Sequence, residues 1–179
     1  MKTKTIGLII LMMCLSFGCA KQQFVKSENI TVEKVVDEMT DEVLFKINIE
    51  STNKEAVLSV YRDEVSYKID LLLPESSNKI EASLTDFGYY TADSTIRFDK
   101  KDRVETILYV SKTLRFASFS PGEEFTTKIV EELTSSEQLL IQVPVFTRSQ
   151  KLYKFDIVGF NYAFDEVQKL LKRERKKLF

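Results

Sequence analysis

Apolar and polar residues alternate along much of this chain with a period of two, and this feature most limits how it folds. The alternation is clearest from residue 42 to residue 50. Apolar side chains stand at Val43, Phe45, Ile47 and Ile49, and polar ones at Glu42, Lys46, Asn48 and Glu50. Because successive side chains of a strand point to opposite faces, the pattern predicts strands with one buried face. Further strands are predicted over residues 31–36, 56–62, 66–73, 79–84, 94–98, 104–110, 113–119, 139–147 and 151–158.

The connections between these segments are short and polar. One of them, Asp99-Lys100-Lys101-Asp102, joins Phe98 to Val104 and has the composition of a hairpin turn. Consecutive strands joined by tight turns pair antiparallel. The sequence therefore predicts a mainly antiparallel sheet.

Two segments have helical spacing instead. The first opens with Ser120, Pro121 and Glu123, the arrangement of a helix N-terminus, and carries an apolar stripe to about Leu133. The second follows Gly159, with Asn161 as its expected cap, and is amphipathic up to the C-terminus. We thus expect an α+β fold: a mainly antiparallel β sandwich or open barrel, with one internal helix and a C-terminal amphipathic helix.

The N-terminus has the layout of an export signal. Lys2 and Lys4 precede an apolar run over residues 6–15, which is too short to cross a bilayer as a helix. The segment ending in Gly18-Cys19 resembles the lipobox of bacterial lipoproteins, in which the Cys is lipidated and becomes the first residue after cleavage. A secretory signal cut near Ala20, or a short membrane anchor, are the alternatives.

Cysteine usage favours the lipoprotein interpretation. Cys14 lies inside the signal and Cys19 at the cleavage point, so residues 20–179 contain no thiol. Several acyl chains, palmitate among them, hold a protein durably on a bilayer, whereas one chain is marginal. Ala20 rather than Asp follows the Cys, which in enteric-type lipoproteins implies an outer-membrane protein facing the periplasm.

The predicted organisation is accordingly simple. Residues 1–18 form the signal peptide, 19–29 a polar tether behind the lipid anchor, and 30–179 a single β-rich domain. At 179 residues the chain can support a hydrophobic core without disulfides or a structural metal.

Composition excludes several classes of chemistry. The chain contains no His and no Trp, so His-ligated metals and Ser-His-Asp or Cys-His nucleophilic sites are ruled out. Neighbouring acids such as Asp63/Glu64 and Glu131/Glu132 point apart on a strand or helix and read as solvated surface. We expect no catalytic, cofactor or metal site. A carboxylate-based hydrolase of envelope material is the alternative from another class.

Charge is unevenly distributed. Residues 19–168 hold 18 basic and 26 acidic side chains, whereas residues 169–179 hold six basic and one acidic. The acidic body and the export signal make nucleic acid a poor partner. Two interpretations of the basic segment 169–179 are open. Its cations bind anionic lipid headgroups, or they stabilise the C-terminus of the predicted helix.

An aromatic cluster stands between two predicted strands. Phe87, Tyr89 and Tyr90 surround Gly88, a residue that takes positive φ at no steric cost. Exposed aromatics of this kind are common anchors of partner-binding surfaces. The alternative is that the three rings fill the end of the β-core. The cluster is the candidate binding site of the chain.

The order of several short motifs resembles that of VasI-like accessory proteins of type VI secretion loci and invasion-associated-locus-B-like periplasmic proteins. The motifs are Thr40-Asp41-Glu42, Ile96-Arg97-Phe98-Asp99, Leu139-Leu140-Ile141-Gln142-Val143 and Phe155-Asp156-Ile157-Val158-Gly159-Phe160. The resemblance implies a β-domain that binds without catalysing a reaction. We therefore expect a lipid-anchored cell-envelope protein that acts as a binding or accessory module, with the membrane and an envelope protein as partners.

Overall fold

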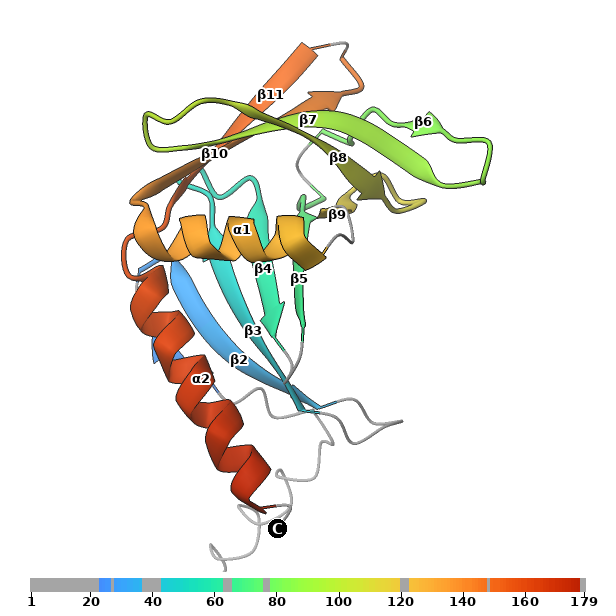
Figure 1. Cartoon of the computed structure of the whole chain (residues 1–179). Helices are drawn as coiled ribbons and strands as arrows, with labels where there is room; N and C mark the ends of the chain where they lie inside the picture. Colours follow the sequence, from blue (N-terminus) through green and yellow to red (C-terminus); the bar gives the residue numbers. More distant parts are fainter. Residues whose placement is uncertain are drawn as a thin grey trace, which may run out of the picture.

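The structure, a computed structural model, describes residues 23–26, 28–36, 43–62, 66–75, 78–119, 123–147 and 149–177. Within these ranges eleven strands form one antiparallel sheet, and two helices cover it (Figure 1). The strands are β1 (Gln23–Lys26), β2 (Ile30–Val36), β3 (Val43–Glu50), β4 (Val57–Arg62), β5 (Tyr67–Leu72), β6 (Ser83–Leu84), β7 (Tyr90–Phe98), β8 (Val104–Val110), β9 (Phe116–Phe119), β10 (Gln138–Val145) and β11 (Ser149–Asp156); the helices are α1 (Glu123–Ser135) and α2 (Phe160–Lys177).

The strands follow the order β1-β2-β3-β4-β5-β9-β8-β7-β10-β11, with β6 paired to β7. The first five strands are neighbours in sequence and meet the rest of the sheet through β5 and β9. Strand β11 then returns toward the β3–β4 turn, where Ser51 bridges Phe155 and Thr52 N donates to Lys154 O over 2.8 Å. The sheet is therefore an open half-barrel, and the predicted fold class is confirmed.

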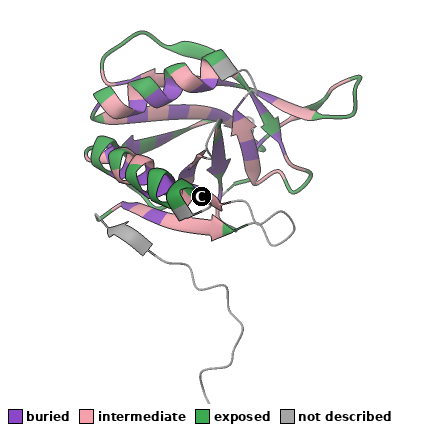
Figure 2. Ribbon diagram, turned by 60° about the horizontal axis from the view of Figure 1, so that its bottom comes forward, coloured by how far each residue is buried: buried purple, intermediate pink, exposed green. Residues whose placement is uncertain are grey.

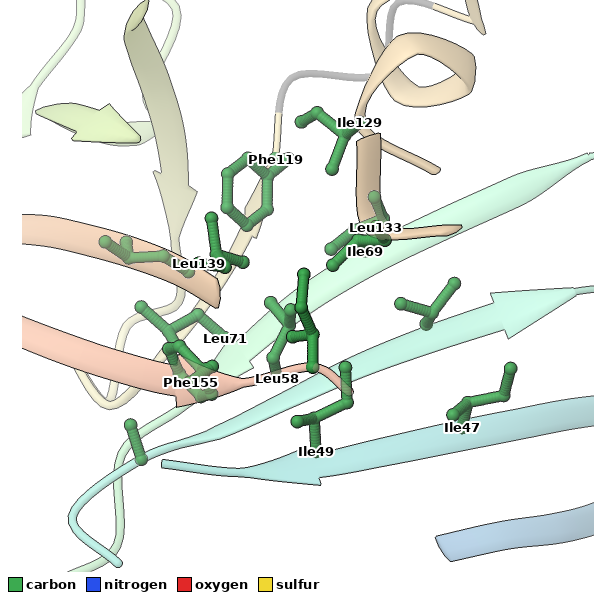
Figure 3. Close-up of a cluster of buried hydrophobic side chains, with 14 of the residues drawn as sticks. Ile47, Ile49, Leu58, Ile69, Leu71, Phe119, Ile129, Leu133, Leu139 and Phe155 are labelled. Carbon is green, nitrogen blue, oxygen red and sulfur yellow. The ribbon is translucent and has the colours of Figure 1, made fainter. Parts of the chain in front are cut away.

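The inner face of the half-barrel holds the core. Buried side chains from both parts of the sheet, such as Ile49, Leu71 and Phe155, meet Ile129 and Leu133 of α1 (Figure 3). Helix α2 adds Phe160, Ala163 and Val167, and the exposed sides of both helices face away from the sheet (Figure 2). A single cluster of buried hydrophobic residues thus extends from Ile30 to Leu171. Each fully buried Leu, Ile or Phe contributes roughly 1.5–3 kcal/mol.

Two of the motifs singled out in the sequence turn out to shape the chain. Asp99, in the predicted β7–β8 turn, has a φ of 46° and accepts hydrogen bonds at Oδ1 from Glu137 N (3.1 Å) and Gln138 N (2.9 Å). Asp156 Oδ1 accepts from Val158 N over 3.1 Å. These carboxylates satisfy backbone donors at chain reversals, which is what short polar side chains do in turns.

The start of α2 differs from the prediction. The helix begins at Phe160, and the carbonyl of Gly159 accepts from Ala163 N over 3.2 Å. Gly159 has a φ of +93°, so it turns the chain into the helix, and the expected cap Asn161 already lies inside the first turn. The predicted cap of α1 at residues 120–122 lies outside the described residues.

Strand β1 lies within residues 19–29, which the sequence predicted as a tether. It pairs antiparallel with β2, with Gln23 opposite Glu33 and Lys26 opposite Thr31. Part of the segment predicted as a tether is therefore a strand. The edge of β2 offers backbone groups with which a short segment pairs through its main chain, even without a period-two pattern of apolar residues.

Candidate functional site

The β6–β7 turn presents part of the predicted aromatic cluster at the surface. Thr85 N donates to Tyr89 O over 2.8 Å, and Gly88 N donates to Thr85 O over 2.9 Å. Gly88 has a φ of +81°, and nothing lies within 4 Å of where a Cβ would stand. A side chain at this position would strain the backbone rather than collide with a neighbour. The turn is thus held by its own main chain.

The three predicted site residues do not share one environment. Phe87, in the turn, is 87% exposed, and Tyr89 is 62% exposed. Tyr90, the first residue of β7, is partly buried and packs against the core. Adjacent residues of a strand point to opposite faces, so the start of β7 separates the two tyrosines. Phe87 and Tyr89 fit the binding interpretation, and Tyr90 fits the packing one.

A neighbouring strand enlarges the exposed part of this cluster. Tyr109 of β8 meets Tyr89 edge-on, with ring centroids 6.4 Å apart and an interplanar angle of 79°. Ile107, two residues earlier on the same face, is 48% exposed. We call Phe87, Tyr89, Ile107 and Tyr109 the hairpin patch. The sequence gives one indication of the two patch residues on β8. Residues 107–110 are apolar at every position, so the outer face of this strand is apolar as well as the inner one.

An open depression of about 720 Å³ adjoins the hairpin patch and shares Ile107 with it. It lies on the outer side of the sheet, across β7, β8, β10 and β11. Its other lining residues are Asp93, Ser94, Thr95, Arg103, Glu105, Thr106, Gln142 and Gln150. Amide, hydroxyl and charged groups thus stand beside exposed aromatic rings, which is the composition of a surface that binds polar partners through apolar anchors.

Two carboxylates, Asp93 and Glu105, line this depression. Asp93 pairs with Ile107 and Glu105 with Thr95, so the two acids are diagonal neighbours across β7 and β8. Both residues are exposed to solvent. The two carboxylates thus face solvent in an open depression.

Of the acid pairs noted in the sequence, Glu131/Glu132 lies on α1, where Glu132 forms a surface ion pair with Lys101. The other pair, Asp63/Glu64, lies outside the described residues. Among the residues that the structure describes, no three metal-ligating side chains come together.

A buried carboxylate on the outer face, Asp70, belongs to the sheet rather than to a ligand site. Its Oδ1 accepts from Ser118 Oγ over 2.6 Å, and Lys68 Nζ lies 3.0 Å from its Oδ2. Lys68 also lies over the rings of Tyr61 and Phe116, which helps to cover the carboxylate. Burial, together with the charge of Asp70, raises the pKa of the Tyr61 hydroxyl. The group is held by partners from β5 and β9.

The C-terminal end of α2 carries the strongest exposed charge. Lys172, Arg173, Arg175 and Lys176 are exposed there, and Glu174 forms an ion pair with Lys34 of β2 at 3.1 Å. The predicted lipidation site, Cys19, lies outside the described residues. Neither of the two described helices is long and apolar enough to cross a membrane.

Comparisons with known proteins add no assignment to this site. No family model matches the chain, and no similar protein is found among the curated proteins or the solved structures. The resemblance to periplasmic accessory domains therefore stays a prediction, which rests on the short motifs alone.

Proposed function

We propose that the chain is a lipid-anchored cell-envelope protein that binds an envelope partner, without catalysis, through the hairpin patch and the adjoining depression. The anchor is Cys19, and the location is the outer membrane facing the periplasm. The observation that carries the binding role is the exposure of Phe87 and Tyr89 on one turn.

Three features of the surface support this proposal. The ring of Phe87 is 87% exposed, so it contributes almost no hydrophobic stabilisation to the fold. A partner that covers the ring would gain that free energy on binding. The turn is closed by backbone hydrogen bonds, so the main chain that carries its aromatics is fixed before binding. Polar groups such as Thr95, Gln142 and Gln150 lie in the depression close by and are able to orient a partner by hydrogen bonding.

The alternative function, a carboxylate-based hydrolase, finds its best support in Asp93 and Glu105. They face one depression from adjacent strands. Both carboxylates are exposed, whereas catalytic groups work in sites that exclude water, so the arrangement favours binding over catalysis. Asp93→Asn and Glu105→Gln variants separate the two functions: each abolishes hydrolysis of envelope material if the alternative is correct.

The binding role is tested by capture of partners from solubilised membranes. Wild-type protein is compared with the Phe87→Ala/Tyr89→Ala variant, and captured proteins are identified by mass spectrometry. We expect the variant to lose the partners that wild type retains, since truncation of a hot-spot aromatic weakens binding by about 2 kcal/mol or more.

Tyr162→Ala is the matched control. Tyr162 of α2 is 75% exposed, so it is an aromatic of similar exposure outside the hairpin patch. The control variant should capture the same partners as wild type. If the double variant and wild type capture identical sets in equal amounts, the hairpin patch is not the binding surface.

A further inference from the structure

The tertiary structure places the basic end of α2 beside the strand through which the chain leads to Cys19. Strand β1 runs antiparallel to β2, with Gln23 opposite Glu33. The next residue of β2, Lys34, forms the 3.1 Å ion pair with Glu174. In Figure 1, α2 runs alongside β2 and ends at the lower side of the molecule. The first residue of β1 and the last turns of α2 therefore lie at the same end.

Chain length limits how far this end is from a bilayer that holds Cys19. Gln23 is four positions after Cys19 in the sequence. Each residue spans at most about 3.6 Å when extended, so a lipid on Cys19 keeps Gln23 within about 14 Å of the membrane surface. The Debye length is about 8–10 Å at ionic strengths of roughly 0.1–0.15 M, so a segment at about two-thirds of its full extension places Gln23 within the range over which surface charges interact.

The last turns of α2 carry a strong positive charge. Lys172, Arg173, Arg175 and Lys176 are exposed, whereas the acid among them, Glu174, is paired with Lys34. Cations near the last turn of a helix stabilise its C-terminus. This effect does not explain why these cations lie near the start of β1, which connects to Cys19.

We infer that the basic end of α2, namely Lys172, Arg173, Arg175 and Lys176, lies against anionic phospholipid headgroups of the membrane that holds Cys19. This inference rests on the lipid anchor of the proposed function. The acyl chains and the basic end together give two membrane contacts, which fix the orientation of the domain. The β6–β7 turn lies at the upper right of the molecule in Figure 1, in the half opposite the end of α2, and would then be held away from the bilayer.

The test uses the full acylated protein reconstituted on vesicles. Since residues 20–179 contain no thiol, an Arg173→Cys variant takes one fluorescent probe at the basic end, and a Phe87→Cys variant takes one at the hairpin patch. Vesicles contain phosphatidylcholine alone, or phosphatidylcholine with phosphatidylglycerol, and both carry a quencher on a small fraction of headgroups.

We expect the probe at residue 173 to be quenched several-fold more on phosphatidylglycerol vesicles than on phosphatidylcholine vesicles. High salt should remove the difference, and the probe at residue 87 should show none. Adding Lys172→Gln, Arg175→Gln and Lys176→Gln should abolish the difference. Adding Lys79→Gln, Lys100→Gln and Lys112→Gln, which remove equal charge from exposed positions elsewhere, should preserve it.

Flotation of the same vesicles separates the inference from the anchor. If the protein floats with phosphatidylcholine but quenching at residue 173 is equal on both vesicles, the anchor stands and the inference is overturned. If it floats with phosphatidylglycerol alone, the anchor fails and the basic end still binds anionic lipid. If it floats with neither, both are wrong.

Discussion

Ser118 donates a 2.6 Å hydrogen bond from its Oγ to Oδ1 of Asp70, across the seam where β9 meets β5. The two strands share three residue pairs there, and they join the first five strands to the rest of the sheet. Asp70 is 1% exposed, so its oxygens depend on protein partners. The bond therefore helps to hold together two parts of the sheet that are distant in sequence.

Removing this donor should weaken the whole fold. We expect Ser118→Ala to lower the free energy of unfolding by about 1–3 kcal/mol, because a buried acceptor loses its partner. Urea-induced unfolding of the purified protein measures the change. Ser83→Ala is the control: Ser83 lies in the same row of outward residues but is exposed, so its truncation should cost less than about 0.5 kcal/mol. Equal losses in the two variants would contradict the role of the seam.

The two sides of the aromatic cluster should respond differently to truncation. Tyr90→Ala removes a ring that packs against the core and should lower the free energy of unfolding by about 2 kcal/mol or more. Phe87→Ala removes an exposed ring and should change it by less than about 0.5 kcal/mol. Thermal melts of both variants check this difference. A large drop in melting temperature for Phe87→Ala would assign that residue to packing.

The hydroxyl of Tyr153 is buried and has no hydrogen-bond partner within the described part of the chain. An unsatisfied buried hydroxyl costs about 1–3 kcal/mol, so its deletion should stabilise the protein. We expect Tyr153→Phe to raise the free energy of unfolding at neutral pH by about 1 kcal/mol, measured in urea. A destabilised variant would show that the hydroxyl has a partner.

The same tyrosine should make stability depend on pH in the alkaline range. Burial, followed by the nearby charge of Glu55, raises the pKa of Tyr153 to about 12, from about 10 in the unfolded chain. The folded state then binds the proton more tightly. The contribution of this protonation equilibrium to the free energy of unfolding is constant below pH 10. It falls as the pH rises from about 10 to 12, because the unfolded chain loses the proton first. Urea unfolding at several pH values measures this change. Across that range the free energy of unfolding should fall less steeply with pH for Tyr153→Phe than for wild type.

Acylation at Cys19 is tested in cells. Wild type should incorporate a labelled fatty acid and fractionate with membranes, whereas Cys19→Ser should do neither. The absence of other thiols from residues 20–179 makes the comparison unambiguous. Equal labelling of the two proteins would remove the anchor from the proposed function.

Much of the local structure could be predicted from the sequence. Alternation in residues 43–49 determines which face of β3 is buried, and the observed burial follows it. The stripe of Phe125, Ile129, Val130 and Leu133 likewise determines the buried side of α1. Strand β7 begins four residues before the predicted start, because its inward residues Ala92 and Ser94 are small or polar and give no apolar period.

What the sequence determined by itself is therefore the type and the buried face of most elements, because these depend on side chains two to four positions apart. The tertiary structure decided the pairing of β5 with β9, the separation of Tyr89 from Tyr90, and the place of β1 and the basic end of α2 at one end of the molecule. These features depend on contacts between residues far apart in the chain, such as Lys34 with Glu174. Periodicity identifies the apolar face of a helix or strand, and only the tertiary structure determines which other element packs against that face.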